Sequence, residues 1–497
     1  MKKNICILLV LFQLLSMTAC SETAETTETD TSEVSAVQET EAEAETEPEE
    51  TERMPDLPAK DFEGDNFVFL TRSMTGDWLA ANIMDIYAEE ENGEGLNDAV
   101  FQRNMYMADT YNLVIEEIKS DDCNSAIRTS VAAQDKAFDV SYVAVETAIA
   151  NAGVGNFLNY YNLEHINFSQ PWWDSNAAES LEIAGKLYVA VNDIMLANNN
   201  ATSAVLFNKQ MIEDYGFMEN PYDLVRDYEW SIDKITEMST SVSNDTDGNG
   251  IYDEHDTYGF MAYRDASLSL FHSSGGRIAA KDAEGNLTIT LMQETTYDAL
   301  IASLTLMAEK STFNLHKVLE ASHPNDLYSV SENMFRSNQG LFYWILIHDI
   351  QKFRDMEADF GVLPVPSADP QMYGYGCNVN QYHGCLMSVL TTANPAQAGY
   401  VLEAMSAKSR YTVQEEYYNI CLDRKYSRDE DSSEMLDIIF DNRVYDVGAY
   451  YTFGNFSWDI IYMTMTDNTD IASIYKKSEK VANKTLERLV KNYSELD

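Results

Sequence analysis

The sequence predicts an α/β fold, because strand-like and helix-like segments alternate along much of the chain. "NFVFLTR" (Asn66 to Arg72) is a short apolar run typical of a strand, and "LNDAVFQRNMYMADTYN" (Leu96 to Asn112) has helical apolar spacing. The 497 residues suggest two or three domains, and the 45% of hydrophobic residues can fill sizeable cores. Such alternation favours helices layered on a largely parallel sheet.

The segments that follow continue this alternation of strands and helices. After the first strand we expect a loop with Asp77 and Trp78 and a helix through Ile83, and in the next helix we expect Val100, Met105, Met107 and Tyr111 to face the core. "NLVIEEI", "SAIRTSVAAQ" and "AFDVSYVAV" then predict strand, helix and strand. Further strands are expected at Lys186 to Val191, Thr202 to Lys209 and Gly340 to Leu346.

The first 20 residues have the pattern of a secretory signal peptide. Lys2 and Lys3 precede a short apolar run from Ile5 to Leu15, which is too short for an ordinary membrane-spanning helix. The ending Met17-Thr18-Ala19-Cys20 resembles a bacterial lipobox, with Met17 in place of the usual Leu. This resemblance implies cleavage before Cys20 and lipid attachment to its thiol. A plain secreted protein with an incidental cysteine is the alternative.

The composition of residues 21–58 predicts that they form a disordered acidic tether. The segment consists mainly of Thr, Glu, Ala and Ser and offers little apolar surface to offset the entropy of ordering. Its carboxylates repel one another, so the tether extends and holds the following domain away from a membrane surface. A solvated tail without a role predicts the same disorder.

Charge and cysteine content narrow the class of protein. The formal net charge of −49 argues against nucleic acid as a partner, because phosphates are repelled. The spacing of Cys123, Cys377, Cys385 and Cys421 matches neither a zinc site nor a redox pair. The sequence does not decide between a Cys377–Cys385 disulfide and buried free thiols.

Residues 245–256, "DTDGNGIYDEHD", have the spacing of an EF-hand-type calcium loop. Gly250 at the sixth position permits the turn that gathers oxygen ligands around a hard cation. The predicted Ca²⁺ ligands are Asp245, Asp247, Asn249, Ile251 through its carbonyl, Asp253 and Asp256. A helix beginning after Ser231 and a strand at "TYGFMAY" flank the loop, which favours a structural brace over a sensor. An acidic turn without metal is the alternative.

Several phrases, in order, resemble the extracellular solute-binding proteins of carbohydrate ABC importers, the group containing maltose-binding protein. They include "PWWDSNAAESLEIAGKLYVAVNDI", "SAVLFNKQMIEDYGFMENPYDLVRDYEWSIDKI", "SSGGR", "DFGVLPVP" and "NPAQAGYVLEAMS". The resemblance implies a two-lobed periplasmic-binding-protein-like fold (type II) with a ligand cleft between the lobes. Lobe 1 would comprise 59–195 and 365–405, and lobe 2 196–364 and 406–497, with crossings near 192–201 and 362–376.

The same resemblance implies a monomer on the extracellular face of the cell membrane. It would capture a small solute, a sugar or oligosaccharide, and pass it to ABC permease subunits, touching the membrane only through its lipid. Sugar recognition needs flat apolar faces and convergent carboxylates and amides. On that criterion the candidate ligand-binding residues are Asp77, Trp78, Glu146, Asn192, Asp193, Tyr343, Trp344, Tyr375 and Trp458.

Two other classes compete with this interpretation. A surface glycoside hydrolase needs two carboxyls at a defined separation, but the sequence has no motif that selects a pair and no GxSxG, HExxH or Walker motif. The seven histidines lack ligand-like spacing, and His383 is interpreted as structural. We therefore expect no enzyme. A lipoprotein that senses a ligand for a membrane receptor would share the fold, and the sequence leaves the ligand's identity open.

Overall fold

The computed structural model describes residues 52–73, 82–422, 430–466 and 468–496. The predicted signal peptide, Cys20, most of the tether, Asp77 and Trp78 lie outside these residues. No helix within the described ranges is both long and apolar enough to cross a membrane.

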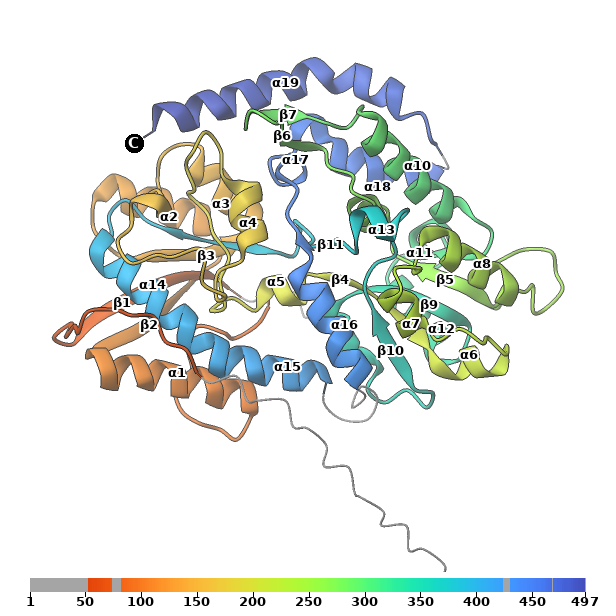
Figure 1. Cartoon of the computed structure of the whole chain (residues 1–497), viewed down its shortest axis with the longest axis horizontal. Helices are drawn as coiled ribbons and strands as arrows, with labels where there is room; N and C mark the ends of the chain where they lie inside the picture. Colours follow the sequence, from red (N-terminus) through yellow and green to blue (C-terminus); the bar gives the residue numbers. More distant parts are fainter. Residues whose placement is uncertain (1–51, 74–81, 423–429, 467, 497) are drawn as a thin grey trace, which may run out of the picture. The chain divides into compact units, whose positions relative to one another are not determined.

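Two separate β-sheets organise the described chain (Figure 1). The smaller sheet has the order β12–β3–β1–β2, and its strands are β1 (Asp65–Arg72), β2 (Leu113–Ser120), β3 (Val140–Ala144) and β12 (Cys385–Val389). The larger sheet has the order β10–β4–β9–β5–β8, and its strands are β4 (Ser203–Asn208), β5 (Tyr258–Ala262), β8 (Thr312–Asn314), β9 (Gly340–Leu346) and β10 (Phe360–Leu363). Two further pairs join β6 (Ala279–Lys281) to β7 (Leu287–Ile289) and β11 (Cys377–Asn378) to β13 (Arg443–Val444).

The smaller sheet is largely parallel, as predicted, whereas the larger sheet is mixed. β1 pairs in parallel with β2 and β3, and β5 pairs in parallel with β8 and β9. β12, β4 and β10 pair antiparallel with their neighbours. The parallel strands place their carboxyl ends on one edge of each sheet, where binding sites of α/β proteins form.

Helices cover the sheets and connect them. In the first half of the chain these are α1 (Gly95–Tyr111), α2 (Cys123–Ala133), α3 (Val145–Ala152), α4 (Ser175–Leu181), α5 (Ala197–Asn200), α6 (Lys209–Asp214), α7 (Pro221–Arg226) and α8 (Ile232–Val242). Those in the second half are α9 (Ala266–Ser273), α10 (Glu294–Ala308), α11 (Leu315–Leu319), α12 (Leu327–Arg336), α13 (Pro370–Tyr373), α14 (Pro395–Ser409), α15 (Glu415–Leu422), α16 (Glu430–Asp441), α17 (Val447–Tyr450), α18 (Phe456–Thr466) and α19 (Ile471–Glu495). Shorter turns are η1 (Tyr160–Asn162), η2 (Ile347–Phe353), η3 (Arg410–Gln414, a π-helix) and η4 (Phe453–Asn455).

The core face of α1 differs from the prediction. Val100 and Met107 are buried as expected and Tyr111 is half-buried, but Met105 is exposed. Arg103 takes an interior position instead and donates to the carbonyl oxygens of Asp85 and Ile86 at 2.8 and 2.7 Å. An arginine can occupy the core because these carbonyls satisfy its donors.

One other predicted element is wrong. Residues 186–191 form no strand and make only isolated bridges, Ile183 with Lys186 and Ala190 with Met387. An apolar run alone predicted this strand, and the run finds no continuous strand partner. The helix predicted through Ile83 falls mainly outside the described residues, and Ile83 itself lies in irregular structure.

The chain passes between the two sheets through segments that lie side by side. Residues 191–202 lead from the Ala190–Met387 bridge to β4, and residues 364–384 lead from β10 to β12. Thr202 bridges Val379, and β11 pairs with β13 in parallel. We call residues 191–202, 364–384 and 442–446 the crossing region. The first connection lies where the resemblance implies and the second extends beyond residue 376, while the exact lobe boundaries stay a prediction.

Candidate functional site

A cavity of about 530 Å³ lies at the carboxyl ends of the parallel strands of the larger sheet. Tyr263 directly follows β5, His316 lies just after β8 and Leu346 ends β9. We call this cavity the ligand pocket. Its lining residues are Tyr263, Arg264, Asp265, His316, Tyr328, Trp344, Leu346, His348, Asp349, Lys352, Asn380, Tyr382, His383 and Trp458. The volume falls in the range of about 300–1,000 Å³ typical of small-molecule sites.

Aromatic rings form two groups in the pocket. Tyr263 packs edge-on against Trp344 with ring centroids 5.5 Å apart, and against Tyr328 at 5.1 Å. On α18, Trp458 meets Tyr382 edge-on at 6.3 Å and carries the Arg264 guanidinium over its ring at 5.1 Å. Aromatic rings that line a cavity can stack on the C–H groups of a sugar.

Charged and amide groups stand beside these rings. The Asn380 amide donates to the Asp265 carboxylate at 3.1 Å, and Arg264 lies 3.9 Å from the same carboxylate. Lys352 pairs with Asp349 at 3.0 Å. Burial raises the pKa of Asp265, although the Asn380 hydrogen bond and Arg264 oppose the rise. The pocket therefore combines apolar faces with hydrogen-bond donors and hydrogen-bond acceptors.

Two pocket histidines are neutral at neutral pH. Burial lowers the pKa of His316 to about 4, with Arg264 adding to the effect, and burial also lowers that of His383 to about 4. His316 accepts from the backbone N–H of Arg264 at 3.4 Å through Nδ1, which leaves its Nε2–H to donate to the Tyr328 hydroxyl at 3.2 Å. For His383, the charge of Asp349 opposes the effect of burial on the pKa, and His348 and Arg72 add to it.

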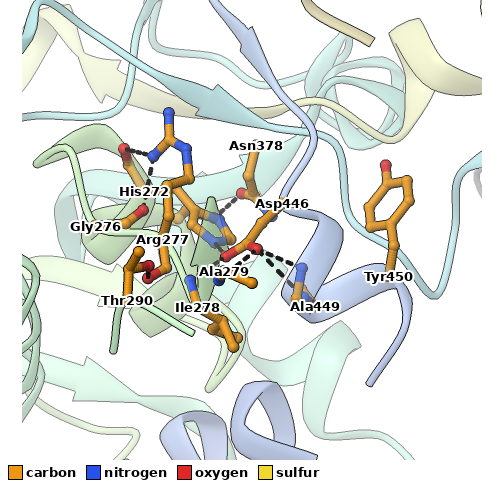
Figure 2. A network of polar contacts seen from close by, with 12 residues as sticks. His272, Gly276, Arg277, Ile278, Ala279, Thr290, Asn378, Asp446, Ala449 and Tyr450 are labelled. Carbon is orange, nitrogen blue, oxygen red and sulfur yellow. Dashed lines mark hydrogen bonds and ion pairs between the residues drawn. The ribbon is translucent and has the colours of Figure 1, made fainter. Parts of the chain in front are cut away.

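A buried carboxylate anchors the segment that brings Trp458 to the pocket. Figure 2 shows Asp446 accepting from His272 of α9 at 3.1 Å and from the backbone N–H of Ile278 at 2.6 Å. Asp446 also caps α17 by accepting from the N–H of Gly448 at 2.7 Å. Burial raises the pKa of Asp446, but the hydrogen bond and charge of His272 and the N–H donor of Ile278 outweigh it, so the pKa lies below its ordinary value.

The structure brings only part of the predicted ligand-binding set together. Trp344 and Trp458 line the pocket. Tyr343 lies on the other side of β9, buried, with its hydroxyl 2.8 Å from that of Ser331. Tyr375 is also buried and donates to the Val225 carbonyl at 3.1 Å.

Three further candidates lie outside the pocket lining. Glu146 is exposed in the first turn of α3. Asn192 is buried and accepts from the N–H of Ile194 at 3.1 Å. Asp193 lies 3.4 Å from Arg410. In this structure the contacts of Asn192 and Asp193 stabilise the crossing region.

Sequence reasoning missed most of the pocket lining. Tyr263 is the last residue of the predicted strand "TYGFMAY", and Arg264 and Asp265 directly follow it, so their position at a strand end was the available signal. His383 also lines the pocket, in addition to any structural role. Asn380 and Tyr382 come from the connection between β11 and β12, which no local pattern places there.

The calcium-like loop lies between α8 and β5, as predicted, and Ser231 caps α8. Carboxylate oxygens of Asp245, Asp247 and Asp256 all lie within 4.8 Å of one another. Asp245 accepts from the N–H groups of Gly248 and Gly250, each at 2.8 Å, and Gly250 has φ of 83°. Three converging carboxylates and a left-handed glycine fit a hard divalent cation.

The described cysteines are free thiols. Cys123, Cys377 and Cys385 are buried and Cys421 is partly buried. Burial raises the pKa of Cys377 and of Cys385 to about 12, so both stay protonated at neutral pH.

No family model matches the sequence, and no curated protein matches it. Solved structures do match the fold. The sugar-binding protein MalE from Xanthomonas citri is 11% identical, with a TM-score of 0.56 over 87% of this chain and 100% of that chain. The cyclic alpha-maltosyl-1,6-maltose binding protein from Arthrobacter globiformis is 12% identical, with a TM-score of 0.56 over 85% and 99%.

The ABC substrate-binding protein Lmo0181 from Listeria monocytogenes, solved with cycloalternan, is 12% identical with a TM-score of 0.51 over 86% and 99%. At these identities the likeness shows the fold. The chain has the two-lobed α/β architecture of such binding proteins, with a sheet at the centre of each lobe.

Proposed function

We propose that this chain captures a sugar or oligosaccharide outside the cell and delivers it, chemically unchanged, to the permease of an ABC importer. The observation that carries the proposal is the ligand pocket, where aromatic faces of Tyr263, Trp344 and Trp458 stand beside paired carboxylates and an amide. Sugars need such faces for their C–H groups and such polar groups for their hydroxyls. The fold likeness supports transport, because the similar structures are those of a sugar-binding protein and an ABC substrate-binding protein.

A thermal-shift screen of the purified chain against a panel of sugars tests the proposal. We expect at least one carbohydrate to raise Tm, because a ligand that binds only the folded state stabilises it by RT ln(1 + [L]/Kd). Chromatography of the recovered sugar should show it intact. Cleaved product would indicate a glycosidase, and no shift with any carbohydrate would contradict the proposal.

We also propose that the chain is exported and held at the membrane by lipid on Cys20, with residues 21–58 as the tether. The support is the lipobox-like sequence. Metabolic labelling with a palmitate analogue in a bacterial host should label the full-length chain, and Cys20→Ala should remove the label. Label retained in Cys20→Ala would contradict the anchor.

The calcium-like loop is proposed to hold Ca²⁺ as a brace between α8 and β5. Chelation with EGTA should lower the free energy of unfolding by about 3 kcal/mol when Ca²⁺ was present at roughly 100 times its Kd, and adding Ca²⁺ back should restore it. Asp245→Asn should abolish this response. Asp282→Asn is a matched control, because Asp282 accepts backbone N–H bonds in another acidic glycine turn. A wild-type Tm indifferent to EGTA would contradict the brace.

A further inference from the structure

We infer that the ligand pocket selects an uncharged, polyhydroxylated saccharide, and that the indole N–H of Trp344 and the Nε–H of Arg264 are the donors that bind it. This inference rests on the proposed function and adds the chemical class of the ligand. It is carried by the charge balance of the pocket lining and by two buried N–H groups that have no hydrogen-bond partner among the described residues.

The cations of the pocket are already neutralised by carboxylates. Arg264 faces Asp265 at 3.9 Å, and Lys352 is held by Asp349 at 3.0 Å and by Glu332 at 2.8 Å. Among the described residues, the lining thus contains two cations and two carboxylates, each cation beside a carboxylate. An anionic ligand would have to displace one of these pairs, and a cationic ligand would have to compete with Arg264 or Lys352 for a carboxylate.

Other charges near the pocket do not favour an anion. His316 and His383 are neutral at pH 7, because burial lowers their pKa values to about 4. The whole chain carries a formal net charge of −49, so its long-range field repels anions as they approach. A uronic or sialic acid therefore meets an unfavourable field outside and no free counter-charge among the two lining cations.

Two buried donors point to a ligand rich in acceptor oxygens. Trp344 is 1% exposed, and within the described ranges neither its Nε1 nor the Nε of Arg264 has a hydrogen-bond partner. Buried donors are satisfied in nearly all proteins, so such groups in a cavity wall call for an acceptor from outside the chain. A sugar hydroxyl or ring oxygen supplies one without bringing charge.

The lining also offers acceptors, which a polyhydroxylated ligand requires. The carboxylates of Asp265 and Asp349 keep lone pairs beyond those used by Asn380 and Lys352. Each sugar hydroxyl both donates and accepts, so it matches a wall that presents both functions next to aromatic faces. This complementarity distinguishes a saccharide from an apolar ligand of the same volume.

Calorimetric titration of the full chain with size-matched trisaccharides tests the inference. The neutral probes are maltotriose and raffinose, the acidic probe is trigalacturonate, and the cationic probe is the deacetylated chitosan trimer. We expect the better neutral sugar to bind at least about 10-fold more tightly than either charged probe. Its affinity should change less than about 2-fold between roughly 50 and 500 mM salt, because no charge pairing with the ligand is screened.

Removing one donor tests the assignment of Trp344. Trp344→Phe keeps an aromatic ring and removes the N–H, and should weaken the neutral sugar about 10-fold, as expected for one lost buried hydrogen bond. Trp172→Phe is the matched control, because Trp172 is equally buried but lies outside the pocket. It should leave the affinity unchanged.

The outcomes separate this inference from the proposed function. Tighter binding of trigalacturonate or of the chitosan trimer overturns the charge argument and leaves sugar capture standing. An unchanged affinity in Trp344→Phe overturns the donor assignment. If no probe binds, and the wider carbohydrate panel gives no thermal shift, the proposed function fails together with the inference. The wild-type titrations decide the charge class even if Trp344→Phe does not fold.

Discussion

In the crossing region, charged and amide side chains hold chain segments together, whereas in the ligand pocket the same kinds of side chain line a cavity. Arg443 binds Asp174 at 3.0 Å and donates to the side chain of Asn199 at 2.5 Å, and Tyr445 also donates to Asp174. In the pocket, the Nε1–H of Trp344 and the Nε–H of Arg264 have no hydrogen-bond partner among the described residues, which also holds for the Nε–H of Arg443 in the crossing region. The two pocket donors differ in that their residues line a cavity, where a ligand can reach them.

The largest effect that sharpens this comparison is expected from Arg443→Met. The substitution leaves the buried carboxylate of Asp174 without its counter-ion, and breaking such a pair costs about 3–5 kcal/mol of folding free energy. Urea unfolding should show this loss, while the folded fraction should keep its affinity for sugar within about 2-fold. A large loss of affinity with unchanged stability would mean that the crossing region takes part in binding directly.

A pH effect is expected next, from Asp85 beside the first crossing. Asp85 accepts from the Leu196 N–H and the Tyr142 hydroxyl, each at 2.8 Å. Burial raises its pKa to about 7, against the opposing hydrogen bonds and the charge of Arg103, while Glu117 adds to the rise. A raised carboxyl pKa means that stability is highest below the unfolded pKa and falls as pH rises through the folded one.

The wild type should therefore lose about 2 kcal/mol of stability between pH 5 and pH 8 through this group. Asp85→Asn should flatten that dependence, because an amide can still accept both hydrogen bonds and does not ionise. Urea titrations at the two pH values provide the measurement. An equal slope in wild type and variant would show that Asp85 is ionised throughout this range.

Trp458→Ala should act on binding rather than on folding. Trp458 is 37% exposed on α18 and forms one wall of the pocket, so its removal takes away stacking area without opening the core. We expect a loss of about 10-fold in sugar affinity, near 1.4 kcal/mol, with a small change in Tm. An affinity equal to wild type would place the sugar away from this wall.

The smallest effect is expected from Glu146→Gln. Glu146 is exposed on α3 and does not line the pocket. Sugar affinity and Tm should both stay near their wild-type values in the same titrations. A clear loss of affinity would show that the bound state brings α3 to the sugar.

The sequence predicted those parts of the fold that depend on short-range patterns. The strands β1, β4 and β9, the helix α1 and the α8–loop–β5 unit follow from apolar spacing, capping and ligand spacing. Trp344, where the resemblance implies a cleft aromatic, and Trp458 both line the pocket, and their contact with a ligand stays a prediction. Arg103 was not expected inside, because its carbonyl partners come from an irregular segment.

The remainder of the pocket depends on tertiary contacts. Asn380 and Asp265 are 115 residues apart and meet only because the second crossing passes beside the end of β5. Asn192 and Asp193 have side chains suited to binding a sugar, but their oxygens contact the N–H of Ile194 and the guanidinium of Arg410 instead. A local reading of residue type cannot tell these two situations apart.

The last helix has a mechanical consequence. Along α19, Tyr493 is buried against Tyr188, and Asn492 donates to the Gly153 carbonyl beside the smaller sheet, while the helix also packs on η4 and β7 (Figure 1). Its 25 residues make a rod of about 37 Å. A rotation of one lobe about the crossing region would therefore require this helix to slide along one of its contacts or to detach at one end.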